Sequence, residues 1–256
     1  MSDAYNRAQT IPWSKEQTAI DPGLRRFMLG VYMKMGLGLI WSAVLAYAIG
    51  SYAPLTQLVF GTPLFFVIQW GPLALLLFSN VFMKNPSPSA SSFLYWGVVT
   101  LMGAGLSVWV FLAANRASAQ SLGWGTISPT FSMIAVAFLS TAIAFGGLSL
   151  VGYTIKRNLG GIQSMLVMML WGLAPIVLLN GFFFHSGALA IGLQFVSVAM
   201  FSVLVATQTN TLRDFYLSAR DDLRSQAIMT NFGALNLYIA FIAIFQFILQ
   251  MLSSRR

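Results

Sequence analysis

The acidic residues, which could relay protons or bind calcium within a membrane, all lie outside the long apolar segments of this sequence. They are Asp3, Glu16, Asp21, Asp214, Asp221 and Asp222. A charge at the centre of a bilayer costs ~3 kcal/mol on insertion scales, so an acid buried there usually marks a function. The sequence therefore predicts neither an acid-based proton relay through the membrane nor a carboxylate site for calcium.

A serine and a histidine could in principle form a hydrolytic pair. Ser149 stands in a Gly-Leu-Ser segment, and His185 is the only histidine. A nucleophile and its base must lie ~3 Å apart, whereas these two residues are expected near opposite ends of different helices. We therefore predict no enzyme activity and no catalytic residues. His185 is expected to be a solvated turn residue, although it is the one side chain expected to titrate near neutral pH.

Uncharged polar side chains, in contrast, do occur within the apolar segments. They are Gln69, Asn80, Asn180, Gln194, Gln208, Asn236 and Gln246. Hydrogen bonds between helices, worth ~0.6 kcal/mol each on average, would explain most of them. The functional alternative is a polar path across the membrane, for which Asn236, Gln246 and Gln194 are the candidates. Cysteine is absent, which excludes a thiolate metal site, and we expect no metal and no cofactor.

Composition indicates that long apolar helices carry these residues. Hydrophobic residues make up 57% of the chain and charged residues only 8%, whereas soluble domains carry about 25% charged residues. The apolar runs are too long for the strands of a membrane barrel. The net charge of +8 would also suit a nucleic-acid partner, but basic residues accumulate in cytoplasmic loops of membrane proteins. We therefore predict a lipid bilayer as the partner and no nucleic acid.

We predict an all-α membrane protein with seven transmembrane helices. A polar tail is expected at 1–26, without the apolar region of a cleavable signal peptide, and a seven-helix domain at 27–256. The expected spans are 27–52, 64–83, 93–114, 130–153, 162–184, 187–207 and 232–252. The connection 208–231 has an apolar stripe of helical period, typical either of an amphipathic continuation of the sixth helix at the membrane interface or of a solvated helical linker.

Two of these spans carry a stripe of small residues. In the uncharged last segment, long enough to cross ~30 Å, the stripe comprises Gly233, Asn236, Ala240, Ala243 and Gln250, with Gln246 beside it. In the first span it comprises Gly38, Ser42, Ala46 and Gly50. Such stripes predict close helix packing or a polar path. Lys34 heads the first stripe, and we favour an ammonium that extends to the interface over one that points inward.

The basic residues predict the orientation. One side of the predicted topology receives ten of them, namely Arg7, Lys15, Arg25, Arg26, Lys84, Lys156, Arg157, Arg213, Arg220 and Arg224, and the other receives only Arg116, Arg255 and Arg256. This bias places the N-terminus in the cytoplasm and the C-terminus outside. The basic C-terminal pair favours the alternative that the last segment is re-entrant.

Four segments, taken in order, resemble the Bax inhibitor-1 family, in particular its bacterial membrane members. They are 21–26 (DPGLRR) with 31–32 (VY), 145–157 (FGGLSLVGYTIKR), 206–216 (ATQTNTLRDFY) and 234–242 (ALNLYIAFI). The resemblance implies a seven-helix fold with the C-terminal helix at its centre, in a bacterial inner membrane. It also implies a proton-sensitive calcium leak that rests on two aspartates, one ending helix six and one in helix seven.

This sequence departs from the family at both aspartate positions. The first falls on Gln208, or on Ala206 in an alternative alignment, and the second falls on Ala240. Two close carboxylates act as a switch because they share one proton and lose it over a narrow pH range, which Gln208 and Ala240 cannot do. The resemblance therefore implies a Ca²⁺ or other cation leak channel without the acid-triggered gate. The alternative is a non-conducting membrane regulator that binds partners such as a membrane-bound AAA protease.

Overall fold

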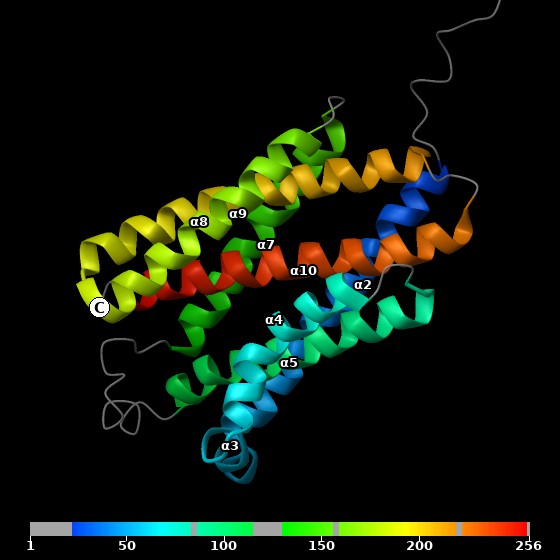
Figure 1. Cartoon of the computed structure of the whole chain (residues 1–256). Coiled ribbons are helices and arrows are strands. Elements are labelled where there is room, and N and C mark those ends of the chain that lie inside the picture. Colours follow the sequence, from blue (N-terminus) through cyan, green and yellow to red (C-terminus); the bar gives the residue numbers. More distant parts are fainter. Residues whose placement is uncertain (1–21, 83–85, 115–129, 156–158, 219–221, 255–256) are drawn as a thin grey trace, which may run out of the picture.

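The computed structural model describes residues 22–82, 86–114, 130–155, 159–218 and 222–254. Within these ranges every regular element is helical, as predicted (Figure 1). The elements are α2 (Pro22–Ser51), α3 (Ala53–Phe60), α4 (Leu64–Phe82), α5 (Pro88–Ala114), α7 (Phe131–Thr154), α8 (Gly160–Leu179), the π-helical turn η1 (Asn180–Phe184), α9 (Gly187–Ser218) and α10 (Leu223–Ser254).

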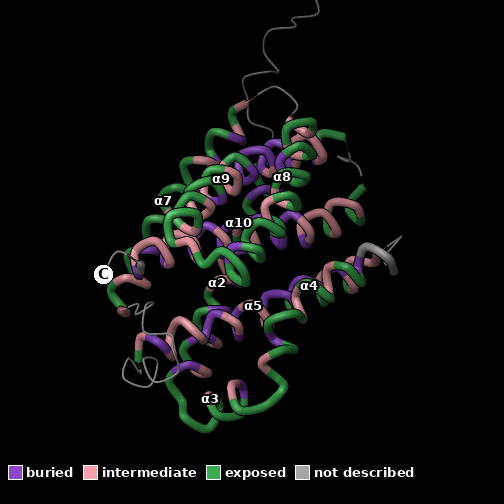
Figure 2. Tube along the Cα trace, turned by 60° about the vertical axis from the view of Figure 1, so that its left-hand side comes forward, coloured by how far each residue is buried: buried purple, intermediate pink, exposed green. Residues whose placement is uncertain are grey.

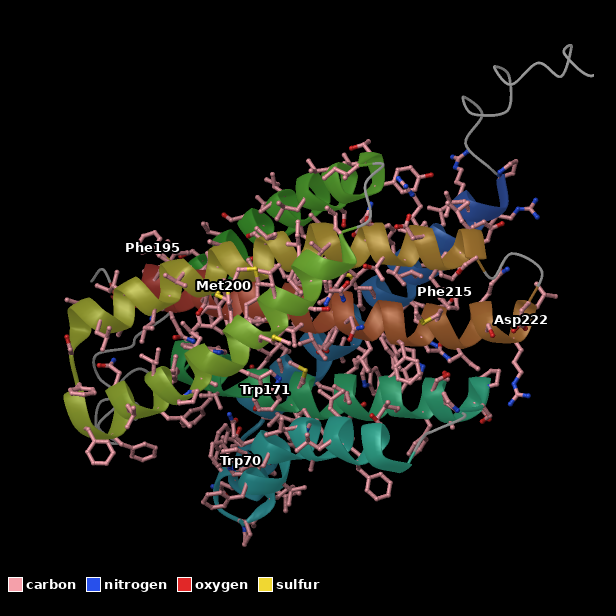
Figure 3. The ribbon with its side chains drawn as sticks, turned by 45° about the horizontal axis from the view of Figure 1, so that its top comes forward. Trp70, Trp171, Phe195, Met200, Phe215 and Asp222 are labelled. Carbon is pink, nitrogen blue, oxygen red and sulfur yellow. The ribbon has the colours of Figure 1, made fainter. Side chains whose placement is uncertain are left out.

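Among the described residues, six helices are long and apolar enough to cross a membrane, or up to seven if one bent pair forms a single span. The bent pair is α3 and the first part of α4, whose axes differ by 70° across a three-residue break. The other six are α2, α5, α7, α8 with η1, α9 and α10. Large apolar side chains such as Trp70, Trp171 and Phe195 are exposed on the outside of the bundle (Figure 3). Such a surface suits lipid chains, and the protein is a multi-pass membrane protein.

Helix α10 occupies the centre of the bundle, with α4 and α5 on one side, α8 and α9 on the other, and α2 and α7 crossing behind it in the view of Figure 1. The most apolar window of α10 is 61% buried, against 6–39% for the windows of the other five long spans. It packs against α2, α5, α7 and α9, and buried residues concentrate along it (Figure 2). Leu237, Tyr238 and Leu249 are fully buried there.

The predicted small-residue stripe on the first span forms the contact between α2 and α5. A Cβ atom on Gly103 would lie 2.7 Å from the Cα of Ser42, and one on Gly50 would lie 2.7 Å from the Cβ of Val110. Close approach of the two backbones therefore depends on these glycines, which confirms the packing role of the stripe. Ser92 pairs with Lys34 at the other end of this contact, so α2 and α5 run parallel.

The connection predicted at 208–231 does begin as a continuation of the sixth helix, as expected, but its first part packs within the bundle. Helix α9 continues to Ser218 and α10 begins at Leu223, so most of the connection belongs to two long helices. The first part of the apolar stripe is buried, because Leu212 and Tyr216 belong to the main core, whereas Leu223 in its second part is 79% exposed. Its period was read correctly, but the stripe alone could not distinguish a lipid surface from a neighbouring helix.

Candidate functional site

The seam between α9 and α10 contains the two positions that carry aspartates in the resemblance. The helices are antiparallel, with Leu212 against Gly233 at one end of the seam and Gln194 donating to Gln250 at 3.4 Å at the other. Gln208 lies one turn before Leu212, and thus on the face of α9 that meets α10. Ala240 is 1% exposed within the core.

The alternative position, Ala206, faces a different helix. A Cβ atom on Gly152 of α7 would collide with the backbone of Ala206, so the backbones of α7 and α9 approach closely at this point. Of the two alignments, only the one through Gln208 directs the residue toward α10. The Oε1 atom of Gln208 is buried and has no hydrogen-bond partner within the described residues. The side-chain carbonyl oxygen of Gln208 thus lies at the seam without a hydrogen bond from the described residues.

The carboxylates of the described residues lie away from this seam. Asp214 is 31% exposed and forms an ion pair with Arg213 at 3.3 Å. Asp222 is exposed and caps the start of α10, where hydrogen bonds from the hydroxyl and N–H of Ser225 hold its pKa below the ordinary value. Four acidic residues, namely Asp3, Glu16, Asp21 and Asp221, lie outside the described residues.

The three candidates for a polar path are not brought together at one point. Gln246 shares a cavity of about 260 Å³ with Gln69, between α4, α5 and α10. Gln194 of α9 is hydrogen-bonded to Gln250, which lies farther along α10 than Gln246. Asn236 is exposed on α10. The structure therefore groups two pairs of amides along one helix, and places Asn236 apart from both.

His185 lies in the turn between α8 and α9, as predicted, and its side chain is exposed. Its φ angle of 47° is left-handed, and its N–H donates to the carbonyl of Asn180 at 2.8 Å to close the π-helical turn. Ser149 is buried near the opposite end of α9, with its hydroxyl 3.4 Å from that of Thr209. These two residues are held by different neighbours in different parts of the bundle.

Lys34 points inward, which corrects the expectation that it extends to the membrane interface. Its ammonium donates to Asn231 of α10 and to Ser92 of α5, the latter at 3.1 Å. The amide of Asn231 donates in turn to the Ser91 hydroxyl at 2.7 Å and to the Pro88 carbonyl at 3.1 Å. The polar partners that hold the ammonium inward come from other helices, so the sequence of α2 alone could not reveal them.

A second polar network joins the end of α7 to α9, and sequence reasoning missed it. Asn210 is fully buried and donates to the carbonyls of Gly152 at 3.4 Å and Ile155 at 2.8 Å. It also accepts from the N–H of Leu159, at 3.2 Å. Arg213 donates to two carbonyls at the same helix end, one of them that of Ile155 at 2.8 Å. The sequence signal that could have indicated this network is the spacing of Asn210 and Arg213, three residues apart and therefore on one face of α9.

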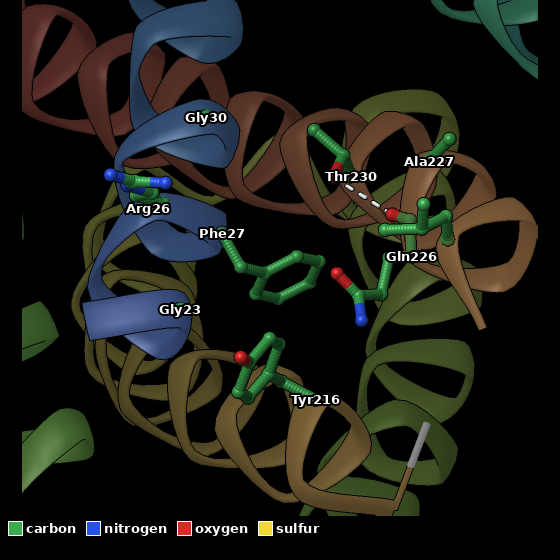
Figure 4. A pocket seen from close by; sticks show the side chains of 9 residues that line it. Gly23, Arg26, Phe27, Gly30, Tyr216, Gln226, Ala227 and Thr230 are labelled. Atoms are coloured by element: carbon green, nitrogen blue, oxygen red, sulfur yellow. Dashed lines mark hydrogen bonds between the residues drawn. The ribbon is translucent and has the colours of Figure 1, made fainter. Parts of the chain in front are cut away.

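Helices α2 and α10 begin, and helices α7 and α9 finish, at the same end of the bundle. This end carries Arg25, Arg26, Arg213 and Arg224, and it is called the basic end below. A pocket of about 450 Å³ opens there between α2, α9 and α10 (Figure 4). Phe27 and Tyr216 stack in its wall with ring centroids 5.5 Å apart. Arg26 and Gln226 border the opening (Figure 4). The predicted basic residues Arg7, Lys15, Lys84, Lys156, Arg157, Arg220, Arg116, Arg255 and Arg256 lie outside the described residues.

Comparisons with known proteins agree with the order of the four segments. A family model described as "Inhibitor of apoptosis-promoting Bax1" matches residues 24–256. A protein of Caulobacter vibrioides is 39% identical, over 98% of each chain. The inner membrane protein YbhL of Escherichia coli is 31% identical, over 91% of this chain and 94% of its own. A protein of Rickettsia prowazekii is 29% identical, over 97% and 98%.

Proposed function

The chain belongs to the Bax inhibitor-1 family, and from this membership we propose that it is a bacterial inner-membrane protein that leaks cations without an acid-triggered gate. The observation that carries the proposal is the side chain of Gln208. It occupies the face of α9 that meets α10, across a seam in which Ala240 is buried. Neither residue has a proton to release, so this seam cannot switch as a carboxylate pair does.

The polar groups that would support a leak are amides. Gln69 and Gln246 line one cavity beside α10, and Gln194 and Gln250 meet farther along. Amide carbonyl oxygens are ligands of Ca²⁺, but without carboxylates they bind it weakly. Weak binding is what a leak requires, because an ion must leave each site as readily as it enters. We propose Ca²⁺ as the transported ion on these grounds.

Flux through purified protein in liposomes tests both parts of this proposal. Gln246→Leu removes an amide from the cavity and should reduce calcium flux several-fold, whereas Leu249→Met, on a buried face of α10, should leave it unchanged. Gln208→Asp combined with Ala240→Asp should create pH-dependent flux that neither single variant shows. Flux through Gln246→Leu equal to that of the wild type, or wild-type flux no higher than that of liposomes without protein, would contradict the proposed path.

The transmembrane arrangement that we propose has seven crossings, with the N-terminus in the cytoplasm. Because α2 and α5 run parallel, the chain must return once between them, and the bent pair α3 and α4 supplies that crossing. Seven crossings place the two termini on opposite sides. The basic end then faces the cytoplasm, in agreement with the preference of arginine for that side. We also propose that the protein has no enzymatic activity, which the separate hydrogen bonding of Ser149 supports.

A second candidate function is a non-conducting regulator that binds another membrane protein, such as a membrane-bound AAA protease. The specific observation in its favour is Lys34, whose ammonium is fixed against α10 near the basic end. A fixed positive charge repels cations that enter from that side. Co-purification of a protease from native membranes, together with no flux above that of empty liposomes at any pH, would favour this function over a leak.

A further inference from the structure

An apolar groove of about 500 Å³ runs between α2 and α7 from the basic end toward the middle of the bundle. Its wall on α7 extends from Tyr153 to Phe145, which corresponds to a length of about 12 Å along the helix. Its wall on α2 is formed by residues including Leu29 and Tyr32. The groove is open at Gly146, because a Cβ atom there would meet nothing within 4 Å.

Among the described residues, the groove is lined by one charged side chain, which stands at the rim. Arg25 lies in the first turns of α2 and is exposed, where it borders the groove opposite Tyr153. The acids among the described residues, Asp214 and Asp222, are not part of the lining. The groove thus combines a cationic rim with an apolar wall that leads away from it, which matches a molecule with an anionic head and a hydrocarbon tail.

We propose that this groove binds an anionic phospholipid, with the phosphate at Arg25 and an acyl chain along Phe145 and Gly146. On the proposed topology the rim lies at the cytoplasmic leaflet, where anionic lipids are concentrated. The hydroxyls of Ser149 and Tyr32 at the groove are each within hydrogen-bonding reach of Thr209, so the wall needs no polar ligand. The guanidinium can form hydrogen bonds to two phosphate oxygens at once, which gives selectivity for the headgroup.

Two neighbouring pairs of residues provide matched variants. Gly146 and Gly147 are both exposed, and a Cβ atom on either would meet nothing within 4 Å, but only Gly146 lines the groove. Arg25 and Arg26 are both exposed at the start of α2, but Arg26 borders the separate pocket shown in Figure 4. Within each pair the change in helix propensity and in total charge is the same, so a difference isolates the groove.

The test is the retention of phosphatidylglycerol or phosphatidylcholine by the full chain in detergent micelles, measured by native mass spectrometry and by the shift in thermal midpoint. The wild type, Gly147→Leu and Arg26→Gln should retain phosphatidylglycerol in preference to phosphatidylcholine and be stabilised by it. Arg25→Gln should bind phosphatidylglycerol about fivefold more weakly, as expected for the loss of one favourable charge at a lipid surface. Gly146→Leu should also weaken binding, because its side chain would occupy the open part of the groove.

The proposal is overturned by equal retention of the two lipids in the wild type, or by equal behaviour within the arginine pair or the glycine pair. It is also overturned if Gly146→Leu abolishes a dimer in place of lipid binding, because the occupant would then be a second copy of this chain. If one glycine variant fails to fold, the arginine pair decides, since both side chains are exposed. None of these measurements depends on ion flux, so failure here is distinct from failure of the proposed leak.

Discussion

Asn210 shows how a single side chain can fasten three helices of this protein together. It satisfies carbonyls at the end of α7 and the N–H of Leu159 at the start of α8, from a fully buried position on α9. The last carbonyls of a helix have no partner within it and must be satisfied by side chains, water or other groups. Arg213 adds a positive charge at the same helix end, where the helix dipole is negative. Two of the segments that resemble the family, 145–157 and 206–216, meet at this point.

Replacement of Asn210 by leucine should therefore destabilise the protein strongly. The variant leaves buried carbonyl and N–H groups without partners, at a cost of about 2–4 kcal/mol. Gln208→Leu is the matched control on the same helix, because the Oε1 atom of Gln208 is buried without a partner and its loss should be neutral or stabilising. Thermal or denaturant unfolding in micelles measures both. Equal effects of the two variants would show that Asn210 does not hold the helices.

The ammonium of Lys34 should be energetically coupled to Asn231, which accepts its hydrogen bond. In a double-mutant cycle, Lys34→Met and Asn231→Leu should show an interaction free energy of about 1 kcal/mol or more. A control cycle that pairs Lys34→Met with Asn236→Leu should be additive within ~0.5 kcal/mol, because Asn236 is exposed on another part of α10. Additivity in the first cycle would show that Lys34 is not coupled to Asn231. It would favour the sequence-based expectation that the ammonium extends to the membrane interface.

At the scale of helices, the spacing of residues predicted where helices form and which face of a helix packs. It could not predict which side chains of neighbouring helices contact that face. The long apolar runs located the spans, although α9 and α10 extend into the predicted connection 208–231. The period of Gly38, Ser42, Ala46 and Gly50 identified the packing face of α2. The inward turn of Lys34 depends on side chains far away in the sequence. The break between α3 and α4 was also missed, because 53–60 is too short to be recognised as part of a span.

The contact between α2 and α5 makes opposite predictions for two nearby glycines. Gly103→Ala would bring its Cβ to 2.7 Å from the Cα of Ser42, so the backbones must separate and stability should fall by about 1–3 kcal/mol. Gly105→Ala meets no atom closer than the Cγ2 of Ile68 at 3.8 Å, and should be neutral or stabilising by up to ~1 kcal/mol. Unfolding midpoints in micelles compare the two. Tolerance of Gly103→Ala would mean that the helices are less closely packed.

At the scale of the molecule, the absence of cysteine allows the proposed topology to be tested cleanly. A single cysteine introduced at Ser14, in the tail, should react with a membrane-impermeant maleimide only after the inner membrane is permeabilised. One introduced at Ser254, at the end of α10, should react in intact spheroplasts. This pattern is expected from an odd number of crossings with the N-terminus inside. Labelling of both positions from the same side would contradict seven crossings and would indicate that the last segment is re-entrant.

The central claim at this scale is that the interior of the bundle, as far as the structure describes it, has no carboxylate pair to be protonated. The candidate positions Gln208 and Ala240 were identified from the sequence through a resemblance, and the structure added that Gln208, and not Ala206, faces α10. The free space beside α10 could not have been predicted, because the cavity shared by Gln69 and Gln246 is formed by three helices.

The most direct measurement is calcium flux through the purified wild-type protein in liposomes between pH 6 and pH 8, with His185→Ala as the control for the one histidine. The account predicts flux that changes little across this range in both proteins, since neither Gln208 nor Ala240 can titrate. A steep increase or decrease with pH that persists in His185→Ala would contradict it, and would place a titrating group within the bundle.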